Sequence, residues 1–367
     1  MEEKIKVITL TLTQSCNLHC IYCYEHNKSQ AVMDADRAKE IIDIEINCSG
    51  DYDILEFDLF GGEPFLAFDL VREITDYICS KPIPQPYTIF LTTNGTLVHG
   101  EVQEWLKEHR CCVVCGLSLD GTREMHNKNR SNSYDSIDLE FFLTQYPLQD
   151  VKMTISKETL PNLAEGVIDL HEKGFLVSCN LAYEIDWSES ENVVLLTREL
   201  EKLIDFYLSH PEIEPCSMLG MDIGCAEENS EVAIRYCGAG QHMKTYDVNG
   251  EHYPCQYFMP LSVGPERAAT AQKIVFPADT FAKDILDAKC KKCIVQVCCP
   301  NCFGANYAST GNIYMRDENM CRLNKVIIRA RSYFRGRQWE LGQLKKTDDE
   351  LQALLHAIVK IQSELVV

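Results

Sequence analysis

The sequence is poor in positive charge and in long apolar runs, and each shortage excludes a class of protein. Only 35 lysines and arginines oppose 55 aspartates and glutamates, so the 367-residue chain carries a formal net charge of −20. A surface of that sign repels phosphate backbones, which argues against nucleic acid as the main partner. No apolar run approaches the roughly 20 residues that a membrane-spanning helix requires, so we expect no membrane partner.

The sequence also lacks internal repeats, low-complexity linkers and a secretion signal. Its first residues alternate apolar with polar side chains, as a strand does, where a signal peptide would have a continuous apolar core. We therefore expect a cytoplasmic protein, in which thiols stay reduced. A hydrophobic content of 46% is ordinary for a globular chain, and 367 residues correspond to about two domains.

The first half of the sequence alternates short apolar segments with segments of helical spacing. The predicted strands are Lys6–Thr13, Leu55–Phe60, Thr88–Thr93, Val113–Leu119, Val151–Ser156 and Leu176–Tyr183. Six strand–helix units in series predict a parallel sheet with right-handed crossovers, and this favours an open or closed barrel over a flat sheet. We predict further helices at about Val193–Leu208 and at Asp348–Leu365.

Cysteine is the residue that the chain has in excess. There are 19 cysteines, and ten of them lie between Cys216 and Cys321. A large chain without a secretion signal does not need disulfides, so these thiols are metal or cluster ligands, catalytic groups or small core residues. In the same region, Val248–Pro254 has Asn249-Gly250 at its tip and predicts a β-hairpin.

Three cysteines directly after the first predicted strand have a spacing that suits an iron–sulfur cluster. Cys16, Cys20 and Cys23 form C-x3-C-x2-C, and functional loops of α/β folds lie at the carboxyl ends of strands. Three thiolates can hold three irons of a [4Fe–4S] cluster and leave the fourth iron open. The alternatives are three unrelated thiols, or a zinc site completed by His19 or His26.

Tyr22 lies directly before Cys23, so this loop resembles the C-x3-C-x-aromatic-C signature of the radical S-adenosylmethionine (SAM) enzymes. The resemblance implies that the open iron binds the amino and carboxylate groups of SAM. It also implies that the reduced cluster cleaves SAM to methionine and a 5′-deoxyadenosyl radical. A reducing flavodoxin or ferredoxin would supply the electron. The implied fold is α/β, a partial (β/α)6 barrel similar to a TIM barrel.

The same resemblance assigns SAM-binding residues at the ends of later strands. Gly61-Gly62-Glu63-Pro64 follows the second strand and is similar to the GGEP motif of the family, whose glycines let the backbone approach the SAM amino group. Further SAM-binding residues implied in this way are Tyr22, Asn94, Ser118 and Arg130. Ser118 begins an S-x-D-G…H…R pattern similar to that of peptide-modifying members. The alternatives are plain strand-end turns and, for Arg130, a salt bridge that stabilises a loop.

The later cysteines resemble the SPASM extension of radical SAM enzymes, in the order C…G-x4-C…C-x2-C-x5-C-x3-C…C. The matching residues are Cys237, Gly250, Cys255, Cys290, Cys293, Cys298, Cys302 and Cys321. The resemblance implies two auxiliary [4Fe–4S] clusters: an outer one held by Cys290, Cys293, Cys298 and Cys321, and an inner one held by Cys237, Cys255 and Cys302. A zinc ribbon is the alternative.

Two points of the auxiliary pattern stay open in the sequence. Cys298 leaves four residues after Cys293 where five are usual; Cys299 would restore five but would leave two before the next cysteine. The inner cluster has three assigned ligands, and its fourth position is taken by Cys225, by Cys216 or by a thiolate of the substrate.

Together these resemblances predict a radical SAM partial barrel over residues 1–210, a small cysteine-rich SPASM domain with a β-hairpin over 211–345, and C-terminal helical structure over 346–367. The implied cofactors are SAM and three [4Fe–4S] clusters. The chain resembles radical SAM peptide maturases, including the group whose precursors carry C-x-x-x repeats. The implied partner is a short, cysteine-containing precursor peptide made by the ribosome, and the implied reaction installs cysteine thioether crosslinks.

Other reactions remain as alternatives. Anaerobic sulfatase maturases, which form formylglycine, have an aspartate base directly after the cysteine of the G-x4-C element, where this chain has Gln256, which cannot act as a base. Carbon–carbon crosslinking, epimerisation of a peptide and a non-catalytic iron–sulfur electron carrier are the others. The basic stretch Arg322–Arg337 predicts either a site for an acidic leader peptide or a solvated helix face.

Overall fold

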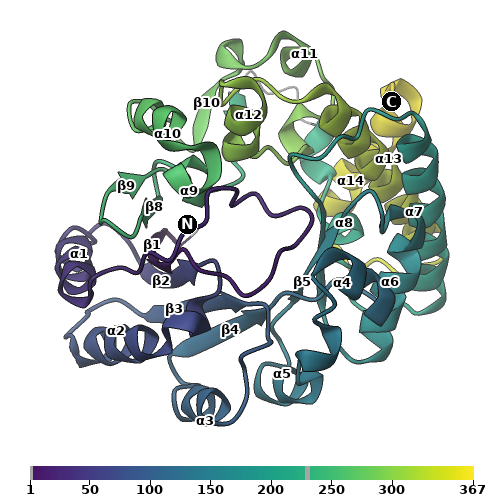
Figure 1. The fold of residues 1–367 in the computed structure, drawn as a ribbon. Coiled ribbons are helices and arrows are strands. Elements are labelled where there is room, and N and C mark those ends of the chain that lie inside the picture. The colour runs from purple at the N-terminus through teal and green to yellow at the C-terminus, as the bar shows by residue number, and fades with distance from the viewer. Residues whose placement is uncertain (1–2, 228–231) are drawn as a thin grey trace. The chain divides into compact units, whose positions relative to one another are not determined.

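The computed structural model describes residues 3–227 and 232–367 (Figure 1). Backbone contacts divide the chain into two compact units. The first unit contains Met1–Leu119, Arg130–Val151 and Cys237–Phe276, and the second contains Asp120–Asn129, Lys152–Tyr236 and Pro277–Val367. Both units are built from segments that are far apart in the sequence. The domain boundaries predicted after residues 210 and 345 stay a prediction.

A six-stranded sheet in the order β4-β3-β2-β1-β8-β9 forms the centre of the first unit. Its strands are β1 (Ile5–Thr13), β2 (Ile54–Gly61), β3 (Tyr87–Thr93), β4 (Val113–Leu117), β8 (Met243–Tyr246) and β9 (His252–Tyr253). Strands β1 to β4 pair in parallel with their neighbours, and β8 pairs in parallel with the other edge of β1. β9 is antiparallel to β8.

The first four predicted strands are present close to their expected bounds, because their apolar residues are buried: every second residue of β2 and β3, and most residues of β1 and β4. Ile8, Leu10 and Phe57, for example, are fully buried. The predicted hairpin is also confirmed: β8 and β9 are its strands, and Gly250 at its tip has a φ of 79°. The sequence did not predict that β8 extends the main sheet beside β1.

A buried carboxylate explains why β8 lies there. Glu45 of helix α1 is 1% exposed and binds Lys6 of β1 at 2.8 Å and Lys244 of β8 at 2.9 Å. It also accepts a hydrogen bond from Tyr246 of β8. Burial alone would raise the pKa of Glu45, but these hydrogen bonds hold it below its ordinary value. The carboxylate thus joins both strands to one helix.

Helices of the first unit connect and cover its strands. They are α1 (Ala35–Asn47), α2 (Phe68–Ser80), α3 (Glu101–Glu108), α5 (Leu139–Gln145), α9 (Pro260–Val263) and α10 (Pro265–Ala271), with 3-10 turns η1 (Pro64–Ala67), η2 (Tyr134–Ser136) and η5 (Gln256–Phe258). Asp34 caps α1 by accepting a hydrogen bond from the Arg37 amide at 3.0 Å. Figure 1 shows α1, α2 and α3 on one side of the β1–β4 sheet.

The second unit combines two strand pairs with long helices. β5 (Val151–Ile155) pairs with β6 (Val177–Leu181), and β7 (Val232–Ile234) pairs in antiparallel fashion with β10 (Thr280–Ala282). Its helices are α4 (Arg123–Asn129), α6 (Leu163–Glu172), α7 (Glu191–Ser209), α8 (Ser217–Gly220), α11 (Ala288–Lys291), α12 (Phe303–Thr310), α13 (Glu318–Glu340) and α14 (Asp348–Glu364), with 3-10 turns η3 (Leu160–Asn162), η4 (Gly224–Glu227), η6 (Lys283–Ile285) and η7 (Gln296–Cys298).

Helix α13 is central to the packing of this unit, because it contacts α7, α8 and α14. Helices α7 and α14 confirm the predicted helices in this part of the chain. The capping box of Thr347 and Glu350 begins α14. Among the helices of the described residues, none is both long and apolar enough to cross a membrane.

Candidate functional site

The carboxyl ends of the parallel strands β1 to β4 form the candidate active-site edge of the first unit. The register pairs Thr13 at the end of β1 with Gly61 at the end of β2, and Thr93 at the end of β3 with Leu117 at the end of β4. The loops that follow these four strands therefore leave the sheet at one edge. In α/β folds, that edge is where ligands bind.

The loop after β1 carries Cys16, Cys20 and Cys23, and all three thiols are half-buried. The Cys23 amide donates a hydrogen bond to the Cys20 carbonyl at 3.1 Å, so these two residues form a tight turn. The Lys28 ammonium lies 3.2 Å from the Cys23 sulfur. Burial acts to lower the pKa of Lys28, but the nearby Cys23 and Cys16 sulfurs raise it overall.

Gly61 and Gly62 allow this loop to lie directly against the end of β2. A Cβ atom on Gly61 would lie 2.4 Å from the Thr13 carbonyl oxygen, and one on Gly62 would lie 2.4 Å from the Ser15 carbonyl oxygen. The Gly62 and Glu63 amides donate hydrogen bonds to the same two carbonyls, at 3.1 Å and 2.9 Å. The predicted glycines thus set the position of the cysteine loop.

Glu63 is 1% exposed, and its carboxylate accepts three hydrogen bonds. The donors are the Thr93 hydroxyl at 2.8 Å, the Asn94 amide at 2.8 Å and the Phe65 amide at 3.3 Å. Burial raises the pKa of Glu63 to about 7, although these donors oppose the shift. The carboxylate therefore fixes the end of β3 against the Gly-Gly-Glu turn, and its predicted contact with SAM stays a prediction.

Asn94 joins the end of β3 to the cysteine loop, because its side-chain amide donates to Asn17 Oδ1 at 2.9 Å. Asn17, between two of the cysteines, in turn donates to the Thr96 hydroxyl at 2.8 Å. The Arg130 guanidinium carbon lies 5.4 Å from the centroid of the Tyr22 ring, a distance typical of a cation–π contact. The sequence did not single out Asn17, whose position inside the cysteine motif was the available signal.

Ser118 lies at the end of β4, is half-buried and donates its amide to the Thr93 carbonyl at 2.9 Å. In the second unit, the Asp120 carboxylate of the same sequence pattern is fully buried. It accepts hydrogen bonds from the Thr154 amide at 2.9 Å and from Asn129 at 3.0 Å. Asp120 thus has a structural role, tying helix α4 to β5.

The second unit gathers the outer set of cysteines around a cavity of about 80 Å³. The cysteines that line it are Cys290, Cys293, Cys299 and Cys321. Cys298, the predicted ligand, is absent from this lining; it is 2% exposed and donates to the Val295 carbonyl at 3.5 Å, and both it and Cys299 belong to a core cluster with Ile328 and Leu354. Burial raises the pKa of the Cys290 thiol to about 11 and that of Cys298 to about 12.

Cys302, predicted for the inner cluster, lines a second cavity of about 130 Å³ in the same unit. Its sulfur accepts a hydrogen bond from the Ala305 amide at 3.4 Å and so caps α12. Tyr183 and Glu184, which follow β6, and Arg316 also line this cavity. Arg316 was not singled out from the sequence, and nothing in its sequence neighbourhood signalled it.

The other two predicted ligands of the inner cluster, Cys237 and Cys255, lie in the first unit. Their loops touch, since the Gly240 amide donates to the Pro254 carbonyl at 3.0 Å. Cys255 is followed by Tyr257, whose ring stacks on Tyr24 of the cysteine loop with centroids 4.3 Å apart. The first unit therefore places the Cys255 turn against the loop of Cys16, Cys20 and Cys23.

The two candidates for the remaining inner ligand differ in their surroundings, both within the second unit. Cys216 is 1% exposed, and its backbone amide donates a hydrogen bond to the Tyr207 hydroxyl at 2.9 Å. Cys225 on η4 is exposed, and its thiol points to the Val297 carbonyl at 3.7 Å. Among all described residues, no three acidic, histidine or cysteine side chains are placed to chelate one metal ion.

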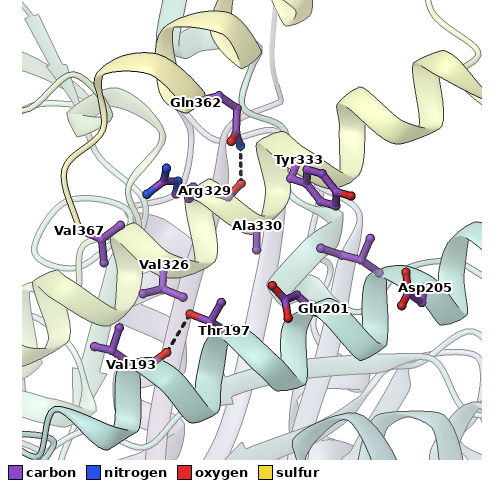
Figure 2. A pocket seen from close by; sticks show the side chains of 11 residues that line it. Val193, Thr197, Glu201, Asp205, Val326, Arg329, Ala330, Tyr333, Gln362 and Val367 are labelled. Carbon is purple, nitrogen blue, oxygen red and sulfur yellow. Dashed lines mark hydrogen bonds between the residues drawn. The ribbon is translucent and has the colours of Figure 1, made fainter.

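The basic stretch on α13 contains several structural residues. Arg331 is 3% exposed and donates to the Met218 carbonyl at 2.8 Å, and Arg335 donates to the Gly220 carbonyl, so both bind the end of α8. Arg329 lines a cavity of about 600 Å³ between α7, α13 and α14. Figure 2 shows Glu201 and Asp205 of α7 facing the same cavity, and none of the residues predicted to bind SAM or a cluster lines it.

Comparison with known proteins identifies the first part of the chain. Residues 10–138 match the family model of the Radical SAM superfamily. An uncharacterized protein of Methanocaldococcus jannaschii is 29% identical over 46% of this chain and 59% of its own length. The radical SAM cyclopropyl synthase TigE of Paramaledivibacter caminithermalis is 22% identical over 89% of this chain and 74% of its own length. The AdoMet-dependent heme synthase of Methanosarcina barkeri is 26% identical over 88% of this chain and 97% of its own length.

Solved structures share the fold. The structure of anSMEcpe with bound AdoMet has a TM-score of 0.68 and 18% identity, and the match covers 96% of this chain and 98% of that one. A structure of the same protein with AdoMet and the Cp18Cys peptide has a TM-score of 0.65, with coverage of 93% and 99%. These likenesses confirm the predicted α/β fold class. The chain therefore contains a Radical SAM domain at residues 10–138, the domain of an enzyme superfamily, and SAM and a [4Fe–4S] cluster are the cofactors expected with it.

Proposed function

We propose that this enzyme modifies a short precursor peptide made by the ribosome, and that the modification is the installation of cysteine thioether crosslinks. The observation that carries the radical chemistry is the single sheet edge at which the cysteine loop, the Gly61-Gly62-Glu63 turn and Asn94 meet. The fold shared with a peptide-bound structure of anSMEcpe supports a peptide as the substrate class.

The residues of this edge suit a cluster and SAM. Cys16, Cys20 and Cys23 would hold the cluster: they lie on one loop, are half-buried and have no disulfide partner. Gly61 and Gly62 bring the end of β2 directly against that loop, and the SAM amino group would bind beside this turn. A reduced cluster with SAM bound to it would supply a 5′-deoxyadenosyl radical. The chain's own contribution is to hold the loop in place and to exclude water from the reacting atoms.

We also propose two auxiliary [4Fe–4S] clusters, with one revision of the ligands expected from sequence. Cys290, Cys293, Cys299 and Cys321 would hold the outer cluster, because these four thiols line one cavity. Cys298 would not be a ligand, because it does not line this cavity, although both Cys298 and Cys299 belong to the same buried core cluster. Cysteine thiolates are the usual ligands of such clusters.

The assignment of Cys237, Cys255 and Cys302 to an inner cluster rests on the resemblance of the sequence to SPASM regions. Four ligands close a cluster, so three assigned cysteines leave one position for Cys225 or for a cysteine of the substrate. Cys216 suits this role less well, because it is buried beside Tyr207. A substrate thiolate in this position would be deprotonated and held by the cluster, which would prepare it for thioether formation. A flavodoxin or ferredoxin would be the electron donor, and the cytoplasm the location.

A second candidate substrate is a tetrapyrrole. The match to the AdoMet-dependent heme synthase of Methanosarcina barkeri covers 97% of that protein, and the name of that protein indicates a tetrapyrrole and not a peptide. Formylglycine formation has less support in this chain, because Gln256 stands where sulfatase maturases have an aspartate base.

Incubation with candidate substrates separates these reactions. The anaerobically reconstituted, reduced enzyme is given SAM and either a cysteine-containing peptide encoded next to its gene or an iron porphyrin. The proposal predicts a peptide product that has lost two hydrogen atoms and one alkylatable thiol. Turnover of the porphyrin alone, or a peptide product that has lost its cysteine sulfur, would contradict the thioether proposal. The variant lacking Cys16, Cys20 and Cys23 is the control.

A further inference from the structure

Arg316 stands between the two cysteine-lined cavities of the second unit. It lines both the cavity of Cys290, Cys293, Cys299 and Cys321 and the cavity of Cys302. It precedes α13 in the sequence, and its guanidinium group is half-buried. No other residue among those that line the two cavities is shared by both.

The two arms of the guanidinium bind one short segment. Nη1 donates to the Cys299 sulfur, and Nη2 donates to the Pro300 carbonyl at 2.8 Å. This segment, from Cys299 to Cys302, carries one cysteine into each cavity. A planar group with donors in a fixed fork can hold two acceptors at a set separation, which an ammonium group cannot do.

The positive charge of Arg316 is not balanced by an acidic partner. Among the described residues, no carboxylate lies within ion-pair distance of it, and its two acceptors are a sulfur and a carbonyl. The neighbouring Lys289 differs, because it pairs with Glu318 at 2.7 Å and Asp287 at 3.6 Å. A guanidinium without a counter-ion, next to four thiols, would stabilise a negatively charged group bound in this cavity.

We propose that Arg316 is a positioning residue that raises the reduction potential of the outer auxiliary cluster and so favours electron transfer onto it. The inference rests on the proposed auxiliary clusters. Reduction adds one electron, from a flavodoxin or ferredoxin, to a cluster that is already anionic. A nearby positive charge and an N–H group directed at a ligand sulfur both stabilise the reduced form more than the oxidised form.

The test uses a protein that holds only the auxiliary clusters. In the background C16A/C20A/C23A, redox titrations followed by electron paramagnetic resonance are compared for Arg316, Arg316→Gln and Arg316→Lys. Arg316→Gln keeps an N–H donor but removes the charge, and Arg316→Lys keeps the charge. Arg329→Met, which removes an exposed arginine of α13 that lines neither cysteine cavity, is the matched control.

The proposal predicts that Arg316→Gln lowers the ratio of reduced to oxidised outer cluster about tenfold at a fixed potential, which is a shift of 59 mV for one electron. Arg316→Lys retains most of the wild-type potential, and Arg329→Met does not change it. A full iron content with an unchanged potential in Arg316→Gln overturns the inference and leaves the cluster sites standing. If Arg316→Gln loses about four irons, the Arg316→Lys variant decides: a fall of about 59 mV in Arg316→Lys, which keeps the charge, overturns the inference. A background protein that binds no iron overturns both this inference and the proposed clusters.

Discussion

Substituting alanine for Gly62 tests whether the Gly-Gly-Glu turn sets the position of the cysteine loop. A Cβ atom at this position would lie 2.4 Å from the Ser15 carbonyl oxygen and 2.9 Å from the Cys16 Cβ atom. Both atoms belong to the loop, and the carbonyl is rigid backbone. The backbone of Gly62 does not have a positive φ, so the effect of the substitution comes from the contact and not from the local conformation.

The size of the effect follows from the distances. Contacts of Cβ atoms below 3.0 Å are essentially never observed, so the loop must retreat by at least 0.6 Å, the difference between 3.0 and 2.4 Å. Overpacking of this kind costs about 1–3 kcal/mol of stability. A misplacement of about 1 Å in a reacting geometry can lower a rate about 100-fold. The displacement of the loop, at least 0.6 Å, is smaller than 1 Å. We therefore expect Gly62→Ala to lower the rate of 5′-deoxyadenosine formation at least about tenfold, a smaller loss than 100-fold.

The matched control is Gly50→Ala, because a Cβ atom on Gly50 would meet nothing within 4 Å. Both variants are compared with wild type in urea unfolding of the apo protein and in the rate of 5′-deoxyadenosine formation after reconstitution. Gly50→Ala is expected to match wild type in both assays. A Gly62→Ala protein with wild-type iron content and wild-type rate would refute the reasoning.

Three further predictions concern single side chains. Because burial raises the pKa of Glu63 from 4.5 to about 7, its contribution to stability is present at low pH and is lost as the pH rises through that window. Urea unfolding of the apo protein should show wild type losing up to about 3 kcal/mol relative to Glu63→Gln between pH 4.5 and pH 7; parallel curves would refute this. Cys299→Ala should remove about four irons in the C16A/C20A/C23A background while Cys298→Ala keeps them, and the reverse result in an iron assay would restore the ligand expected from sequence. Cys79 and Cys112, whose sulfurs lie 3.6 Å apart, should form a disulfide in air, so peptide mapping should find a linked pair; two alkylated thiols after oxidation would contradict it.

The sequence was sufficient to predict the edge at which the cysteine loop and the Gly-Gly-Glu turn meet. Both follow directly after apolar strands, and the carboxyl ends of parallel strands lie on one edge whatever the details of packing. The motifs are local in sequence, so their spacing carried the information. The hairpin tip at Gly250 was predictable for the same reason, because its turn is encoded by two adjacent residues.

Other features depend on contacts between residues far apart in the chain. The pairing of β8 with β1 depends on Glu45, some two hundred residues before its partners Lys244 and Tyr246, and no periodicity reports such a pairing. The choice between Cys298 and Cys299 depends on which thiol lines the cavity of Cys290, Cys293 and Cys321, and the sequence spacing of two adjacent cysteines does not decide it. Arg316 lies outside every motif and gains its place only through the folded segment that it binds.

The central claim is that Cys16, Cys20 and Cys23 hold the cluster that cleaves SAM. The most direct measurement is 5′-deoxyadenosine formation by the reconstituted, reduced enzyme, compared with the C16A/C20A/C23A variant under the same conditions. The account predicts that wild type forms 5′-deoxyadenosine and that the variant forms none while retaining about eight irons. Continued formation of 5′-deoxyadenosine by the variant, or a wild-type protein that holds stoichiometric zinc and no labile sulfide, would contradict it.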